Sequence, residues 1–150
     1  MKTMLNIGAG LLLLLVLLGL TAAVMSRGGG SPAALPAVFE EGLTFEAALD
    51  RAGSDRPVVA VVSADWCGPC QHFKSEGLAG DAFARWVEER GAVPVMIDAT
   101  DGVPGGVSSW ASGPIPSTRV FVGGEGGEKL VGAVPEGELI AWLEKEVGGS

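Results

Sequence analysis

The stretch Ser63–Phe73, SADWCGPCQHF, contains all the cysteine and histidine residues of this chain. These are residue types that can bind a metal ion, exchange electrons or transfer a proton. Cys67 and Cys70 are the only cysteines among the 150 residues, and His72 is the only histidine. Residues of these types could bind zinc, attach a haem, form a static disulfide or exchange electrons. Their number and spacing allow these four kinds of chemistry to be compared.

Redox exchange is the chemistry that the spacing favours. A structural zinc site needs four ligands, and the chain offers only these three thiolate or imidazole groups. Haem attachment requires C-x-x-C-H, but Gln71 stands between Cys70 and His72. A static disulfide between residues so close in sequence closes a very small loop and therefore adds little stability. We expect no metal or organic cofactor, only a redox-active Cys67–Cys70 disulfide, and we expect His72 to be a surface residue.

The pair is predicted to lie between a buried strand and a helix. Residues 58–63, VVAVVS, form an unbroken apolar run that is typical of a central, parallel strand covered on both faces. A helix is predicted from Cys67 to about Gly77. Because N–H groups and the dipole at a helix start favour an anion, Cys67 should ionise readily and act as the attacking thiolate. Cys70, one turn later, is the expected resolving thiol.

The other patterns complete an α/β domain. Helices are predicted over residues 45–52 behind an N-cap at Thr44, from Asp81, and from Pro135 onward. Strands are predicted over residues 93–97 and in a hairpin, 119–122 and 128–131, whose loop is GGEGG. Trp86 and Trp142 lie on apolar helix faces and are expected in the core.

The N-terminus predicts a membrane segment. Residues 4–25 are almost wholly apolar and would span about 33 Å as a helix, enough to cross a bilayer core. We assign residues 1–25 to an anchor or signal segment, favouring a retained anchor, residues 26–37 to a flexible linker, and residues 38–150 to the domain. The alternative is a secretory signal cleaved near Thr21-Ala22-Ala23.

Both alternatives place the domain outside the cytoplasm, either anchored with the domain periplasmic or on the outer face, or secreted. The net charge of −8 and only ten Lys and Arg residues argue against binding to nucleic acid. The membrane is an expected partner through the N-terminal helix.

The pentapeptide Trp66-Cys67-Gly68-Pro69-Cys70 resembles the active-site motif of the thioredoxin family, and Ile115-Pro116-Ser117 resembles the family's cis-proline loop. The resemblance covers roughly residues 38–147. It implies a thioredoxin-like three-layer α/β fold, with a central mixed β-sheet flanked by helices. It also implies that Trp66 walls the disulfide, that Gly68 and Pro69 shape the site, and that the backbone of Ile115 beside cis-Pro116 pairs with an extended substrate.

Within the family, the chain is more similar to the C-terminal domain of the bacterial transmembrane thiol:disulfide interchange protein and its small membrane-tethered relatives. Two positions depart from the pattern of cytosolic members. The family's buried acid is replaced by Val61, and its lysine partner aligns with Pro94. Because that pair relays the proton of the resolving cysteine in the family, Asp65 or water would have to accept the Cys70 proton here, or exchange would be slower.

The expected activity is that of a thiol:disulfide oxidoreductase that reduces disulfides of extracytoplasmic proteins. Its partners would be disulfide-containing proteins and a redox partner that recharges the pair. A disulfide-forming oxidase or isomerase is one alternative. A non-catalytic, membrane-tethered binding module is another, although the presence of both cysteines speaks against it.

Overall fold

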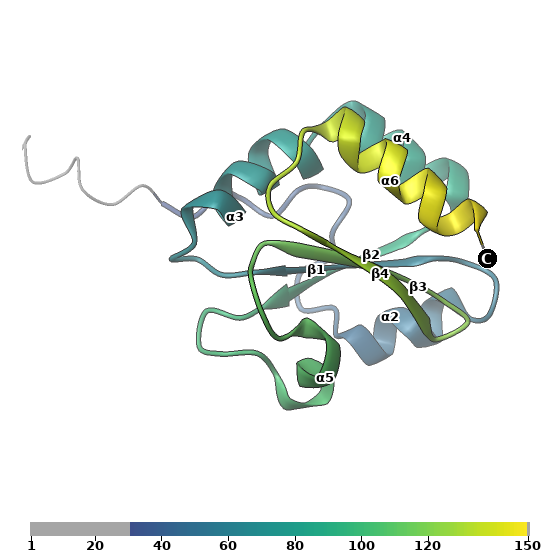
Figure 1. The fold of residues 1–150 in the computed structure, drawn as a ribbon, viewed down its shortest axis with the longest axis horizontal. Helices are drawn as coiled ribbons and strands as arrows, with labels where there is room; N and C mark the ends of the chain where they lie inside the picture. Colours follow the sequence, from purple (N-terminus) through teal and green to yellow (C-terminus); the bar gives the residue numbers. More distant parts are fainter. Residues whose placement is uncertain (1–30, 150) are drawn as a thin grey trace, which may run out of the picture. The chain divides into compact units, whose positions relative to one another are not determined.

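A computed structural model describes residues 31–149 of the chain. Within them, four strands form one sheet in the order β2-β1-β3-β4, and helices cover both faces (Figure 1). The strands are β1 (Val58–Ser63), β2 (Val93–Asp98), β3 (Ser117–Val122) and β4 (Glu125–Val131). The expected α/β architecture with a mixed, helix-flanked sheet is confirmed.

Strand β1 lies inside the sheet, and all six of its residues are buried. It pairs in parallel with β2 on one side and antiparallel with β3 on the other. The prediction of a central, buried strand is therefore confirmed, whereas the prediction of parallel pairing holds for only one of its two neighbours. The other neighbour, β3, is the first strand of the hairpin and runs antiparallel to β1.

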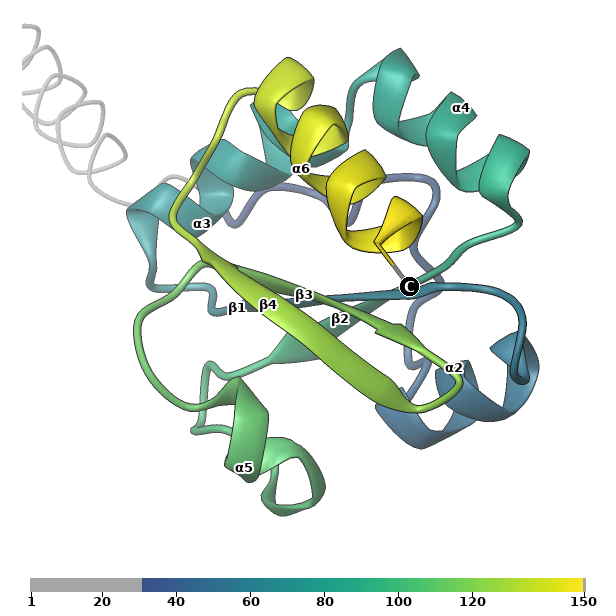
Figure 2. The same cartoon turned by 45° about the vertical axis from the view of Figure 1, so that its right-hand side comes forward.

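One face of the sheet is covered by α2 (Phe45–Ala52) and α5 (Ser108–Ala111) (Figure 2). Thr44 caps α2 by accepting a hydrogen bond from the backbone N–H of Ala47. Trp110 of α5 packs against Phe45 and Phe121, with ring centroids 4.8 and 4.9 Å apart. The loop after β2 is thus anchored to the core through Trp110 and the nearby 3-10 turn η2 (Gly105–Val107).

The opposite face carries α3 (Gly68–His72), α4 (Asp81–Arg90) and α6 (Glu136–Gly148) (Figure 1). The helix predicted to end near Gly77 ends at Leu78, and its second half is the π-helix η1 (Phe73–Leu78). Buried aromatic and leucine side chains join these helices to the sheet: Phe73, Leu78, Phe83, Trp86, Leu139 and Leu143. Trp86 is in the core as expected, while Trp142 is only half-buried at its edge.

The hairpin is present, but its turn is shorter than predicted. Only Gly123 and Gly124 form the turn, with positive φ angles of 60° and 84°. Two successive residues with positive φ match the twist of antiparallel strands, and glycine adopts them without strain. Gly126 and Gly127, predicted as loop, therefore belong to β4.

The predicted anchor or signal, residues 1–25, lies outside the described residues. In the described part of the predicted linker, Pro36 is buried and the Ala33 N–H donates to Gln71 Oε1 at 2.7 Å. This end of the linker therefore packs on the domain instead of acting as a free spacer. Among residues 31–149, no helix is both long enough and apolar enough to cross a membrane.

Candidate active site

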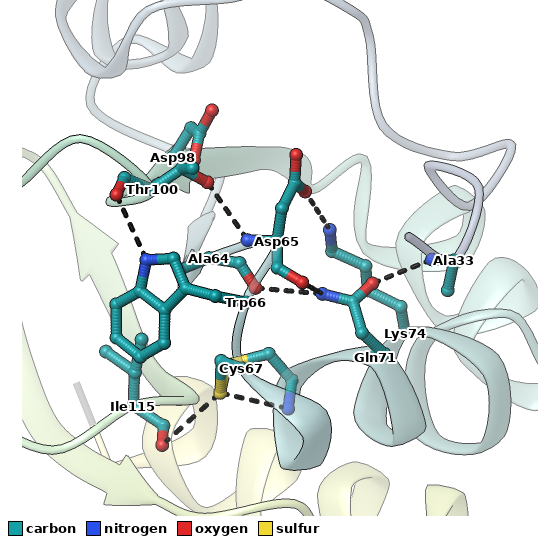
Figure 3. The surroundings of a disulfide bond; sticks show 11 residues. Ala33, Ala64, Asp65, Trp66, Cys67, Gln71, Lys74, Asp98, Thr100 and Ile115 are labelled. Atoms are coloured by element: carbon teal, nitrogen blue, oxygen red, sulfur yellow. Dashed lines mark hydrogen bonds and ion pairs between the residues drawn. A yellow bond between two sulfur atoms is a disulfide. The ribbon is translucent and has the colours of Figure 1, made fainter. Parts of the chain in front are cut away.

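Cys67 and Cys70 form a disulfide where β1 passes into α3, with Cα atoms 5.2 Å apart (Figure 3). Both residues are buried, but not equally: Cys67 is 6 % exposed and Cys70 is 1 % exposed. The two cysteines that the sequence pairs are thus joined in the structure, and solvent reaches Cys67 more easily.

The start of α3 is built around the sulfur of Cys67. Cys67 is the N-cap residue, and its Sγ accepts a hydrogen bond from the backbone N–H of Cys70 at 3.2 Å. Pro69 stands in the first turn, where its missing N–H leaves no helical hydrogen bond unmade. Gly68 has no atom within 4 Å of the position of a Cβ, so it leaves that side of the turn open. A hydrogen bond to sulfur favours the charged form of a thiol, so this local geometry suits a thiolate at Cys67.

The loop before β3 faces the disulfide. The Ile115–Pro116 peptide bond is cis, as the resemblance implies. The carbonyl oxygen of Ile115 lies 3.9 Å from Cys67 Sγ, and the Ile115 side chain packs against Cys67, Cys70 and Ala64. Pro116 is fully buried, and its carbonyl accepts the Gly132 N–H at 2.8 Å. Residues far apart in sequence therefore meet at one sulfur.

Trp66 forms the exposed side of the site. Its side chain is 69 % exposed, and its Nε1 donates to the Thr100 carbonyl oxygen at 3.0 Å (Figure 3). Thr100 Oγ1 also accepts the Asp65 N–H at 2.9 Å. The loop after β2 thus holds the two residues that precede Cys67, and Thr100 is a site residue that no local pattern in the sequence identifies.

Asp98 in turn orders Thr100. Its Oδ1 accepts the Thr100 N–H at 2.8 Å. The hydrogen bonds from Thr100 hold the pKa of the Asp98 carboxyl below its ordinary value of 3.8, in spite of partial burial, and the positive charge of Lys74 acts in the same direction. This carboxylate is therefore ionised at neutral pH.

Gln71 is a second residue that sequence reasoning missed. Its Nε2 donates to the carbonyl oxygens of Ala64 at 2.8 Å and Asp65 at 3.4 Å, while its Oε1 binds the Ala33 N–H (Figure 3). One amide side chain therefore ties α3 to the loop before the cysteines and to the end of the linker. The sequence carries no signal for this because the three partners are backbone groups.

The remaining expectations concern the neighbourhood of the pair. Val61 is fully buried among apolar side chains, and Pro94 is buried on β2 opposite Val59, so the first position supplies no acid and the second no lysine. His72 is exposed on α3, as expected. Within the part of the chain that the structure describes, no three His, Cys, Asp or Glu side chains are grouped so as to hold a metal ion.

Comparisons with known proteins agree with this geometry. The family model described as Thioredoxin matches residues 37–145. Thioredoxin 1 of Nostoc sp. is 35% identical over 94 residues, which are 63% of this chain and 83% of that protein. The chloroplastic M-type thioredoxin of Zea mays is 32% identical over 98 residues, which are 64% of this chain and 54% of that protein, so this chain spans only about half of its length.

Solved structures are similar as well. A mutant thioredoxin from Halobacterium salinarum has a TM-score of 0.51 at 28% identity, covering 80% of this chain and 96% of that one. The thioredoxin of Fasciola hepatica has a TM-score of 0.55 at 20% identity, covering 67% of this chain and 89% of the other, and this likeness supports the fold alone.

Proposed function

This chain belongs to the thioredoxin family, and from that premise we propose that it is a thiol–disulfide oxidoreductase working through Cys67 and Cys70. The single observation that carries the proposal is the disulfide at the start of α3, opposite the Ile115 carbonyl and the cis-proline. No cofactor is needed, because the cysteine pair itself carries the two exchanged electrons when it is a dithiol and lacks them when it is a disulfide.

In the proposed reaction, the thiolate of reduced Cys67 attacks one sulfur of a substrate disulfide. The substrate S–S bond breaks, a Cys67–substrate disulfide forms, and the first substrate thiolate leaves. The Cys70 thiolate then attacks Cys67 Sγ, which releases the second substrate sulfur and re-forms the internal disulfide. The greater exposure of Cys67 supports its role as the attacking thiol.

The surface around Cys67 suits an extended polypeptide. Trp66 offers an exposed aromatic face, and an indole held by a hydrogen bond to Thr100 can pack on a partner with little loss of side-chain freedom. The Ile115 backbone beside the cis bond can pair with an extended chain, as the family resemblance implies. The substrates would thus be disulfide-containing proteins, with a separate redox partner that recharges the pair.

We further propose that the protein works as a reductase, tethered to the membrane with the domain outside the cytoplasm. The direction is supported by Gly68 and Pro69 between the cysteines, which resemble reducing members of the family. The location is supported by the apolar run over residues 4–25 and by similarity to the C-terminal domain of the bacterial transmembrane thiol:disulfide interchange protein. A disulfide-forming oxidase would instead have a potential nearer about −120 mV than about −270 mV.

Trapping the mixed disulfide tests the activity. In Cys70→Ser, the substrate should remain bonded to Cys67, and non-reducing gels followed by mass spectrometry should identify it in the membrane fraction. Cys67→Ser is the matched control because it lacks the attacking thiol. Equal capture by the two variants, or none by either, would contradict the exchange mechanism.

A further inference from the structure

Lys74 is a buried lysine on the helical segment that carries the cysteines. It is 8% exposed, and it follows Cys70 by four residues in the continuous run α3–η1. Its only ion pair in the described part of the chain joins Nζ to Asp65 Oδ1 at 3.9 Å, and the Asp65 side chain is 53% exposed. A buried ammonium is costly unless it is well paired. One long ion pair to an exposed carboxylate does not account for burying it.

Ser63 is a second unexplained polar group. It is 2% exposed, and its Oγ has no hydrogen-bond partner among the described residues. Side chains alternate along a strand, so Ser63 lies on the same sheet face as Val61, which is the face covered by α3 and η1. Buried hydroxyls without partners are rare and call for a water, a ligand or a role.

Both groups line one cavity of about 330 Å³ beside the active-site loop. Four acidic residues line this cavity: Asp65 before α3, Asp98 at the end of β2, and Glu40 and Glu41 before α2. Glu40 is already paired with Arg51 at 2.6 Å. Since a water occupies about 30 Å³, the cavity has room and polar partners for several waters.

Cys70 does not line this cavity itself, but it is connected to two residues that do, Ser63 and Lys74. It packs against Ala64, the neighbour of Ser63, and residues four apart on a helix lie on one face, which places Lys74 on the side of Cys70. A thiol must lose its proton before it can attack a disulfide. Cys70 is 1% exposed, so direct proton loss to bulk water is hindered, and Val61 stands where the family resemblance implies a carboxylate.

We propose that Lys74 and the water-filled cavity at Ser63 activate Cys70: the ammonium stabilises the Cys70 thiolate, and cavity water carries its proton to Asp65 and out to solvent. This role rests on the exchange mechanism proposed above and deepens it. Lys74 touches neither the substrate nor Cys67 Sγ, which is the sulfur that Cys70 attacks. It is therefore a positioning residue that acts through Cys70.

The step balances without another reactant. The Cys70 proton passes to water and then to the Asp65 carboxylate. The electron pair left on sulfur forms the Cys70–Cys67 bond, the Cys67–substrate bond breaks, and its electron pair leaves on the substrate sulfur as a thiolate.

The test measures resolution separately from attack. The reduced full-length chain is mixed with excess 5,5′-dithiobis(2-nitrobenzoic acid), and release of thionitrobenzoate is followed by stopped flow. The first release, by attack of Cys67, depends on reagent concentration; the second, by attack of Cys70 on Cys67, does not. The second rate is recorded from about pH 5.5 to about pH 9.5, a range that includes ordinary thiol pKa values.

Lys74→Met removes the charge but keeps an unbranched side chain. We expect its second phase to slow about tenfold at about pH 7, with a midpoint about one pH unit higher, because a nearby opposite charge shifts a pKa by about one unit or more. The first phase should change less than about twofold. Lys74→Arg should keep the wild-type midpoint, and Lys145→Met, which removes an exposed lysine far along the chain on α6, is the control for net charge.

Ser63→Ala should slow the second phase about threefold, since it removes one partner of the cavity water. If Lys74→Met does not fold, Lys74→Gln gives the same comparison with a polar side chain. An unchanged midpoint in the neutral variant, or an equal upward shift in Lys74→Arg, would overturn the role of Lys74. If wild-type protein releases only one thionitrobenzoate, the exchange mechanism itself fails, which is a different result.

Discussion

Replacing Gly77 by alanine measures how tightly the helical segment that carries the cysteines is packed. A Cβ on Gly77 would lie 2.5 Å from Phe73 Cδ2, 2.6 Å from Phe73 Cε2 and 2.9 Å from the carbonyl oxygen of Val134. Phe73 is 1% exposed in the core, and Val134 O is a backbone atom, so neither can simply swing aside. The added methyl group must therefore displace the ring or the backbone.

Two opposing effects set the size of the change. Alanine is favoured over glycine within a helix by about 1 kcal/mol. Forcing an extra carbon into a packed core costs about 1 to 3 kcal/mol. We expect overpacking to prevail, so Gly77→Ala should lower the free energy of unfolding by about 1 kcal/mol net.

Gly137 provides the matched control. It also lies in a helix, α6, and no atom comes within 4 Å of the position of its Cβ. Gly137→Ala should therefore raise the free energy of unfolding, by about 0.5 kcal/mol. Urea unfolding of the oxidised full-length protein, followed by circular dichroism, compares the free energy of unfolding of both variants with that of wild type. The comparison assumes the same dependence of this free energy on urea concentration in all three proteins.

Phe73→Leu identifies the cause. The smaller side chain leaves room for the new methyl group, so the double variant should cost less than the sum of the two single changes. If Gly77→Ala instead stabilises the protein as much as Gly137→Ala, the ring of Phe73 does not press on this glycine.

Three further predictions concern side chains that hold loops and helix ends. Asp98→Asn should be less stable than wild type at pH 7: because the folded pKa of Asp98 lies below 3.8, its stabilising effect is present above that pH and is lost as the pH falls through the folded pKa, as urea unfolding across pH should show. Thr100→Val should cost about 1 kcal/mol and speed hydrogen exchange at the Asp65 amide, which loses its acceptor. Glu136→Ala should cost about 1 kcal/mol in urea unfolding, because Glu136 Oε1 caps α4 by accepting the Phe83 N–H at 2.8 Å.

Each of these three predictions has a result that would contradict it. A stability gap between Asp98→Asn and wild type that persists unchanged at the lowest pH would show that the charge of Asp98 is not its cause. Unaltered exchange at Asp65 in Thr100→Val would show that the Thr100 hydroxyl does not hold the Asp65 N–H. Glu138→Ala alters an exposed acid in the same first turn of α6, and if it costs as much as Glu136→Ala, the loss is general to that turn.

Features of the fold that depend on neighbouring residues could be predicted from the sequence, whereas features that depend on distant residues could not. The six-residue run of β1 and the Thr44 cap of α2 could be read directly, because burial on both faces and a side-chain cap leave a pattern in neighbouring residues. The hairpin was located correctly, yet its turn was placed too broadly. GGEGG contains four glycines, and only the pairing with β3 decides which two of them turn.

The linker shows a similar limit. Its composition predicts a free spacer, but Pro36 is buried and Ala33 binds Gln71. Composition reports the average tendency of a segment, whereas docking depends on a surface formed by residues elsewhere in the chain. The same reason kept Gln71 and Thr100 out of the predicted site.

By itself, the sequence determined the chemistry: two cysteines at helical spacing behind a buried strand, and too few other ligands for a metal. Local geometry suffices there, because residues three apart at a helix start must face each other. Only the tertiary structure decided what surrounds the sulfurs. The Ile115 carbonyl, the Thr100 hydrogen bonds and the cavity at Ser63 and Lys74 arise where separate segments cross the carboxyl end of β1, and no spacing along the chain records that crossing.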